Sequence, residues 1–169
     1  MTDKQAAAPL KRRFLALVYE SLLVGAVSCA AALPAGLLAL SAQSRPVLAM
    51  FWVSLVFFAA WGWYFLANWR RRGTLAMCVW HIGLADKGGG RPCGRRLAFR
   101  FLWAVLLVVL LPLLAYGLLR YGIHMPPHMA GWRALCCWLL PWGYALLDRD
   151  GQFLYDKLAG TRLVDLKAV

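Results

Sequence analysis

Four stretches of the chain are apolar for long enough to be considered as helices that cross a bilayer. They cover about residues 14–40, 47–69, 97–119 and 131–147. A helix needs about 20 apolar residues to span the hydrocarbon layer, and the last stretch is the weakest because Arg133 lies in its first turn. The sequence therefore predicts an all-α integral membrane protein with four transmembrane helices, in a single domain over residues 1–169.

The composition agrees with a membrane environment. Apolar residues make up 62% of the chain and charged residues 15%, whereas soluble domains carry about 25% charged residues. Nineteen Lys and Arg against seven Asp and Glu give a net charge of +12, and 14% of the residues are aromatic. This balance favours a bilayer with anionic phospholipid headgroups as the partner of the basic residues, and not nucleic acid.

The basic residues are distributed unevenly around the predicted spans. If both termini lie in the cytoplasm, sixteen of the nineteen fall on that side, and only Arg45, Arg120 and Arg133 lie outside. Positive charge resists translocation, so this orientation is strongly favoured. The competing interpretation of the first span as a cleaved signal peptide is disfavoured, because the span is too long and contains Glu20.

The predicted spans form two antiparallel hairpins, and the two halves of the chain are weakly alike. RRFLA from Arg12 resembles RRLAF from Arg95. TLAMCVWHIGLAD, from Thr74, aligns without a gap on FLYDKLAGTRLVD, from Phe153. Two hairpins of the same direction would make a parallel repeat, whose axis runs along the membrane normal.

Two cytoplasmic segments, residues 70–96 and 148–169, are expected to form a small cap. In the first segment, apolar residues near Leu75 predict a short amphipathic helix. Each segment also contains a piece that resembles a short strand: HIGLAD in the first and TRLVDL in the second. KGGGRP predicts a turn, and a nucleotide-binding loop is disfavoured because no Gly-Lys-Ser/Thr follows. Five arginines at the borders of the first segment are candidate lipid-headgroup contacts: Arg70, Arg71, Arg72, Arg95 and Arg96.

Glu20 lies inside the first span, where an ionisable group costs about 2.5–3.5 kcal/mol on insertion scales. Arg13 precedes it by seven residues on the same helical face. That spacing corresponds to about 10 Å of helix, too far for direct contact. We therefore expect Glu20 to meet a water or an arginine from elsewhere, with Arg100 at the start of the third span as the first candidate.

Asp156 is the second acidic residue of interest. Asp156 and Lys157 have apolar residues on both sides, so their segment is expected to fold back against the inner leaflet or the helices. Two interpretations stay open at this point. Arg13, Glu20 and Asp156 serve as a lipid anchor, a buried structural partner and a helix-end cap, or they act on a transported ion or substrate.

The three motifs that contain these residues resemble those of the RDD family of bacterial inner-membrane proteins, named for an arginine and two aspartates. RRFLALVYE resembles the opening motif, with Arg13 as the arginine and Glu20 where an aspartate is usual. GTLAMCVWHIGLAD is similar to the central motif but lacks its glutamine. LYDKLAGTRLV resembles the C-terminal motif, with Asp156 as its aspartate. The resemblance implies a plasma-membrane protein for which transport, in some cases cation/proton exchange, has been proposed.

An enzyme is not expected, and no cofactor or metal is predicted. The five cysteines show no C-x-x-C spacing and only three histidines are present, so no metal site of recognisable spacing exists. His124 and His128 lie in a predicted outer loop, away from every acidic residue that could orient them.

Two functions remain. The first is transport of an ion or small solute by a homo-oligomer, in which Arg13 and Arg100 adjust the pKa of Glu20 and Asp156 supplies a second carboxylate. The alternative is a non-transporting accessory or scaffold protein that binds anionic lipid or a larger membrane complex.

Overall fold

The computed structural model describes residues 7–71, 73–86 and 88–166. Within these ranges the chain divides into two compact units. We call Lys11–Trp80 the hairpin unit, and the described parts of Met1–Leu10 and His81–Val169 the tail unit. Both are largely helical, and a single two-stranded sheet lies in the tail unit.

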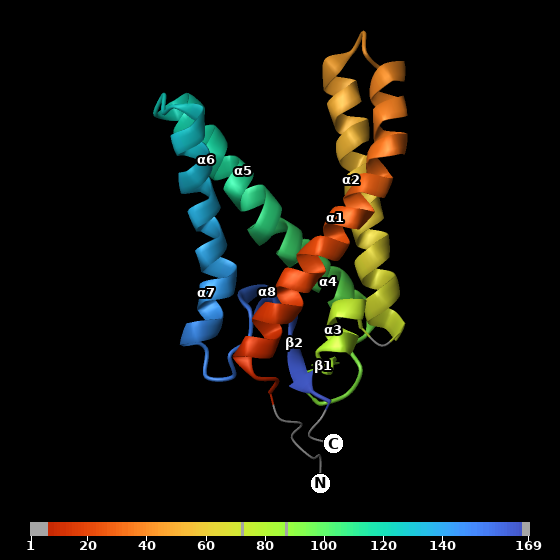
Figure 1. Ribbon diagram of the computed structural model, residues 1–169, viewed down its shortest axis with the longest axis vertical. Coiled ribbons are helices and arrows are strands. Elements are labelled where there is room, and N and C mark those ends of the chain that lie inside the picture. Colours follow the sequence, from red (N-terminus) through yellow and green to blue (C-terminus); the bar gives the residue numbers. More distant parts are fainter. Residues whose placement is uncertain (1–6, 72, 87, 167–169) are drawn as a thin grey trace. The chain divides into compact units, whose positions relative to one another are not determined.

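The hairpin unit consists of two long antiparallel helices and one short one (Figure 1). Helix α1 (Leu10–Ser41) and helix α2 (Pro46–Arg71) are joined by a tight turn in which the Arg45 backbone N–H donates to the Ala42 carbonyl at 2.9 Å. Pro46 begins α2, where its missing N–H costs nothing. Helix α3 (Leu75–Val79) follows, with Thr74 as its N-cap.

The tail unit contains a second helical hairpin (Figure 1). Its first arm is continuous through α4 (Gly94–Val105), the π-helical turn η1 (Leu106–Leu110), α5 (Leu111–Gly117) and the π-helical turn η2 (Leu118–Gly122). Its second arm runs through α6 (Pro127–Leu135), the 3-10 turn η3 (Cys136–Trp138) and α7 (Leu139–Leu147). The two arms pack together along α5, α6, η1 and η3.

A tryptophan links the two arms of this hairpin at a proline. Pro112 has no N–H, so it cannot donate to the carbonyl of Val108 four residues earlier. The indole Nε1 of Trp138 donates to that carbonyl instead, at 2.9 Å. A backbone carbonyl in an apolar environment needs a donor, and Trp138 supplies one to a carbonyl that Pro112 cannot bond.

The sheet joins two short strands that are far apart in the sequence. Strand β1 (Ile82–Asp86) pairs antiparallel with β2 (Thr161–Asp165), and Leu84 faces Leu163 at the centre. Helix α8 (Leu154–Ala159) ends at Gly160, whose φ of 70° is a left-handed conformation that suits glycine, and leads directly into β2. Ala7 forms a β-bridge with Val164, so the start of the described chain lies beside β2.

The positions of these short elements match the sequence repeat. The alignment that places Leu75 on Leu154 also places α3 on α8 and β1 on β2. Leu84 and Leu163, which are equivalent in the repeat, are the two residues that face each other at the centre of the sheet. A local two-fold axis through this pair therefore exchanges the two strands.

Three helical stretches of the described chain are long and apolar enough to cross a membrane: Leu10–Ser41, Pro46–Val79 and Gly94–Gly122. They correspond to the first three predicted spans, and the second stretch takes in both α2 and α3. The fourth prediction, 131–147, falls in the arm formed by α6, η3 and α7, whose pieces have nine, three and nine residues. That arm is helical but is not among the three candidate spans.

Replacing Trp138 tests its role in joining the arms. Trp138→Phe should lower the free energy of unfolding by about 1–3 kcal/mol, because the Val108 carbonyl loses its donor. The measurement is chemical unfolding of the purified protein in detergent. Trp132→Phe is the matched control, since the Trp132 side chain is 73% exposed. Equal stability of the two variants would contradict the assignment.

Candidate functional site

Glu20 is held by two hydroxyl groups within the hairpin unit. Tyr64 of α2 donates to Glu20 Oε1 at 2.8 Å, and the Thr74 hydroxyl donates to Glu20 Oε2. Thr74 is fully buried and also caps α3, because its Oγ1 accepts from the Met77 backbone N–H at 3.3 Å. The carboxylate of the first helix is thus bonded to the second helix and to the residue that starts the third.

Further polar contacts join α1 and α2 beyond Glu20. Two turns farther along α1, Ser28 Oγ accepts from the indole of Trp61 at 2.9 Å. On α2, Asn68 donates to the backbone carbonyl of Tyr64 at 2.6 Å. Polar groups in an apolar helical hairpin act mainly by satisfying one another. Among these polar groups, Glu20 is the carboxylate, and it accepts hydrogen bonds both from α2 and from the N-cap of α3.

Arg13 lies in the first turns of α1, and its side chain is only 1% exposed. Burial of a guanidinium indicates that its charge is used inside the protein, since an unpaired buried charge is very costly. The prediction of Arg13 as a lipid-phosphate anchor fits this burial poorly, because a headgroup contact needs an accessible guanidinium.

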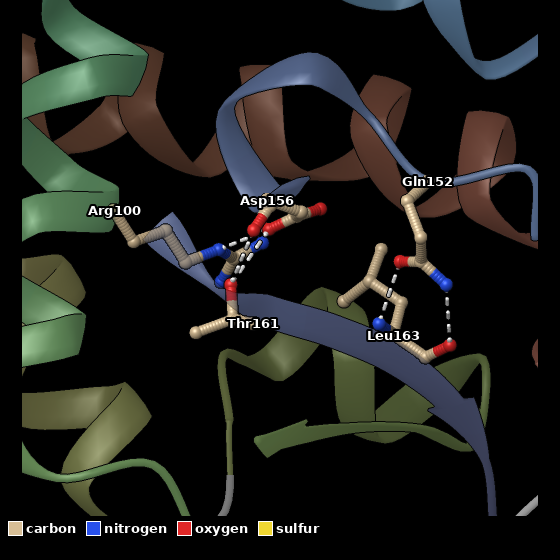
Figure 2. A network of polar contacts seen from close by, with 5 residues as sticks. All are labelled: Arg100, Gln152, Asp156, Thr161 and Leu163. Atoms are coloured by element: carbon tan, nitrogen blue, oxygen red, sulfur yellow. Dashed lines mark hydrogen bonds and ion pairs between the residues drawn. The ribbon is translucent and has the colours of Figure 1, made fainter. Parts of the chain in front are cut away.

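Arg100 and Asp156 form a buried ion pair in the tail unit (Figure 2). Nε of Arg100, on α4, donates to Asp156 Oδ1, on α8, at 2.5 Å. The Thr161 hydroxyl lies 3.4 Å from the same oxygen, and the Arg100 guanidinium lies 5.7 Å from the centre of the Tyr155 ring. The side chains of Arg100 and Asp156 are 5% and 0% exposed, so their ion pair fixes α8 on α4 away from water.

The outcome for Glu20 and Arg100 differs from the simplest expectation. Within its own unit each has another partner: Glu20 has two hydroxyl donors, and Arg100 has Asp156. Their pairing with each other stays a prediction. Asp156 does fold back on a membrane helix, as expected, although its partner was not foreseen.

Gln152 supports β2 from the side opposite β1 (Figure 2). Its Oε1 accepts from the Leu163 backbone N–H at 2.9 Å, and its Nε2 lies 3.4 Å from the Leu163 carbonyl. The backbone N–H of Ala8 donates to that carbonyl at 3.3 Å. Gln152 and the start of the described chain therefore cover the edge of β2.

The loop before α8 is closed by a second ion pair. Asp148 contacts Lys157 and accepts from the Gln152 backbone N–H at 3.0 Å. Burial alone would raise the pKa of Asp148, but these hydrogen bonds and the charge of Lys157 together hold the pKa below its usual value. Asp148 therefore stays ionised in the folded protein at neutral pH.

The predicted lipid-contacting arginines are not equivalent. Arg70, Arg71 and Arg95 are exposed. Arg96 pairs with Asp86 at the end of β1, although 43% of its side chain stays exposed. Arg72 lies outside the described residues. No group of three or more His, Cys, Asp or Glu side chains within the described ranges has the arrangement of a metal site.

Comparison with protein families decides the relationship that the motifs suggested. The sequence model of the RDD family matches residues 7–160. The chain belongs to the RDD family. Searches of curated proteins and of solved structures found no match.

Three partners in this RDD protein do not follow from the sequence analysis: Tyr64, Thr74 and Gln152. Thr74 carried a signal, because a threonine directly before an apolar helical segment is a typical N-cap. Tyr64 resembled any aromatic residue of an apolar span. Gln152 had no recognisable pattern, since its role depends on how the loop returns to β2.

The buried ion pair of this RDD protein can be tested by removing one partner. Asp156→Asn should lower the free energy of unfolding by about 3–5 kcal/mol, because the Arg100 charge is left buried without its counter-ion. Thermal and chemical unfolding in detergent would measure the change. Arg95→Gln, an exposed arginine of the same helix, should change stability by less than about 0.5 kcal/mol. A similar small effect of Asp156→Asn would overturn the structural role.

Proposed function

We propose that this RDD protein moves an ion or small solute across the bacterial inner membrane, with Glu20 as the carboxylate that binds it. The observation that carries the proposal is the placement of Glu20. It lies ten residues inside α1, and both of its oxygens accept hydrogen bonds from neighbouring elements. A carboxylate that lies in a membrane helix and is hydrogen-bonded by neighbouring hydroxyl groups can exchange a proton or accept a small cation.

The other predicted residues take different roles in this proposal. Arg13 is the basic group on the same helix as Glu20 and contributes positive potential at that end of α1. Asp156 is bonded to Arg100 and Thr161. In this proposal Asp156 therefore holds the tail in place and does not act as a second transport carboxylate. No catalytic role is proposed for any residue.

We propose four spans with both termini in the cytoplasm, arranged as a parallel repeat of two hairpins. The arm of α6, η3 and α7 is the fourth span. It is supported by its packing along the third span and by the bond from Trp138 to Val108. The local two-fold axis of β1 and β2 supports the repeat, because an axis along the membrane normal would relate equivalent strands in this antiparallel way.

Topology reporters test the four-span arrangement. A periplasm-active reporter fused after Val169 should be inactive, and a tag inserted after Ser44 should be accessible only from outside. The same tag after Gly88 is the internal control and should be accessible only from inside. An active C-terminal reporter would place the C-terminus outside, which requires an odd number of spans and contradicts the fourth span.

Flux measurements in proteoliposomes test transport. Wild-type protein should move an ion down an imposed Na⁺, K⁺ or proton gradient, and Glu20→Gln should lower the rate at least about tenfold, because the binding charge is removed. Ser28→Ala is the matched control: it breaks a hydrogen bond between the same two helices without touching Glu20. We expect the control to keep most of the flux.

Two results would refute the transport proposal. One is a folded Glu20→Gln variant with wild-type flux. The other is a folded wild-type protein that moves none of these ions under any gradient.

The alternative is an accessory or scaffold protein that binds anionic lipid or a larger membrane complex. It is favoured by the exposure of Arg70, Arg71 and Arg95 at helix ends, since each basic residue near an anionic surface contributes about 1 kcal/mol. Reconstitution into vesicles with and without anionic lipid separates the two functions. A scaffold would show preference for anionic lipid without flux, whereas the proposed homo-oligomeric transporter would show flux.

A further inference from the structure

Thr74 connects the Glu20 carboxylate of α1 to the short helix α3. We propose that Thr74 transmits the charge state of Glu20 to α3, so that α3 is well ordered when Glu20 is ionised and loosens when that charge is neutralised. Thr74 is then a positioning residue, which acts through Glu20 on one side and through the backbone of α3 on the other.

The chemistry of the hydroxyl gives this link its direction. A threonine hydroxyl has one hydrogen to donate and two lone pairs that accept. An ionised carboxylate only accepts, so Thr74 must donate to Glu20, as it does in the structure. Donation to a charged acceptor polarises the hydroxyl and strengthens its oxygen as an acceptor for the Met77 N–H. A proton or cation on Glu20 weakens both bonds together.

Helix α3 is short enough to depend on this cap. It has five residues, and helices of that length are not stable by themselves. The Thr74 side chain caps it through Met77, and the Thr74 carbonyl accepts from the Cys78 N–H at 3.0 Å. Ala76 and Met77 are buried, whereas Cys78 and Val79 on the same helix are exposed. Packing therefore holds one face of α3, and the Thr74 cap holds its start.

The inference deepens the proposed function but can be tested apart from it. If Glu20 binds a transported ion, α3 is the element that responds when the ion arrives. The contacts between Glu20, Thr74 and Met77 belong to the folded chain and do not require that the protein transports an ion. A protein without flux would therefore still show the coupling, and a transporter could lack it.

The exposed thiol of Cys78 reports on the order of α3. The full chain would carry four replacements that leave this thiol alone: Cys29→Ala, Cys93→Ser, Cys136→Ala and Cys137→Ala. The rate of N-ethylmaleimide labelling would be measured in detergent at constant pH. Thr74→Val should raise the rate about 5-fold, the usual effect of losing an N-cap, and Glu20→Gln should raise it about 2- to 5-fold.

Controls separate coupling from general loosening. Thr74→Ser keeps the hydroxyl and should restore the wild-type rate. Tyr64→Phe removes the other donor to Glu20, which comes from α2 and is not part of the α3 cap, so it should change the rate less than 2-fold. A second protein that retains only Cys93, an exposed thiol outside the hairpin unit, should label at one rate with and without Glu20→Gln.

The double variant distinguishes coupling from two independent effects. In Glu20→Gln, adding Thr74→Val should raise the rate by less than Thr74→Val does alone, because part of the cap is already lost. Fully multiplicative effects, or an unchanged rate in Glu20→Gln, would overturn the proposal and leave Thr74 as an ordinary cap. If Glu20→Gln does not fold, Glu20→Asp replaces it, since its shorter side chain withdraws the carboxylate from Thr74 and should also raise the rate.

Discussion

The ion pair between Arg100 and Asp156 is the contact on which the tail unit depends. Both side chains are almost fully buried, so water cannot solvate either charge. The pair fixes α8 on α4, and α8 leads directly into β2. The hairpin unit contains a related tie, because Thr74 at the start of α3 bonds Glu20 of α1. In each half of the chain a short helix is thus tied to the first membrane helix by one charged residue, which is acidic in the first half and basic in the second.

Much of the architecture follows from hydrophobic length and from turn residues. The first three apolar stretches are helices, and the polar turn before Pro46 joins the first two as expected. The short pieces that end at Asp86 and Asp165 are strands, as expected from the sequence, and each contains a glycine or follows one. Their pairing with each other could not be derived, since it depends on chain segments that meet only after the helices have packed.

The candidate site was predictable in its charges and not in its neutral partners. Glu20 and Asp156 stand out because a charge among apolar residues is rare and needs a partner. The groups that satisfy Glu20 are hydroxyls of Tyr64 and Thr74, and hydroxyls occur so widely in membrane helices that no spacing identifies them. The choice of Arg100 for Asp156 also depends on the direction in which the tail folds back, which local sequence does not specify.

The pairing of β1 with β2 has a consequence for the order in which the chain is completed. Leu84 and Leu163 face each other but are 79 residues apart, and ribosomes add about 5–20 residues per second, so β1 waits about 4–16 seconds for its partner. Ala7 waits even longer for Val164. During synthesis the three long apolar helices are available to the membrane while β1 still has an unpaired edge. Closure of this sheet therefore requires that translation has passed β2, and a chain that stopped before β2 would present an open strand to cellular quality control.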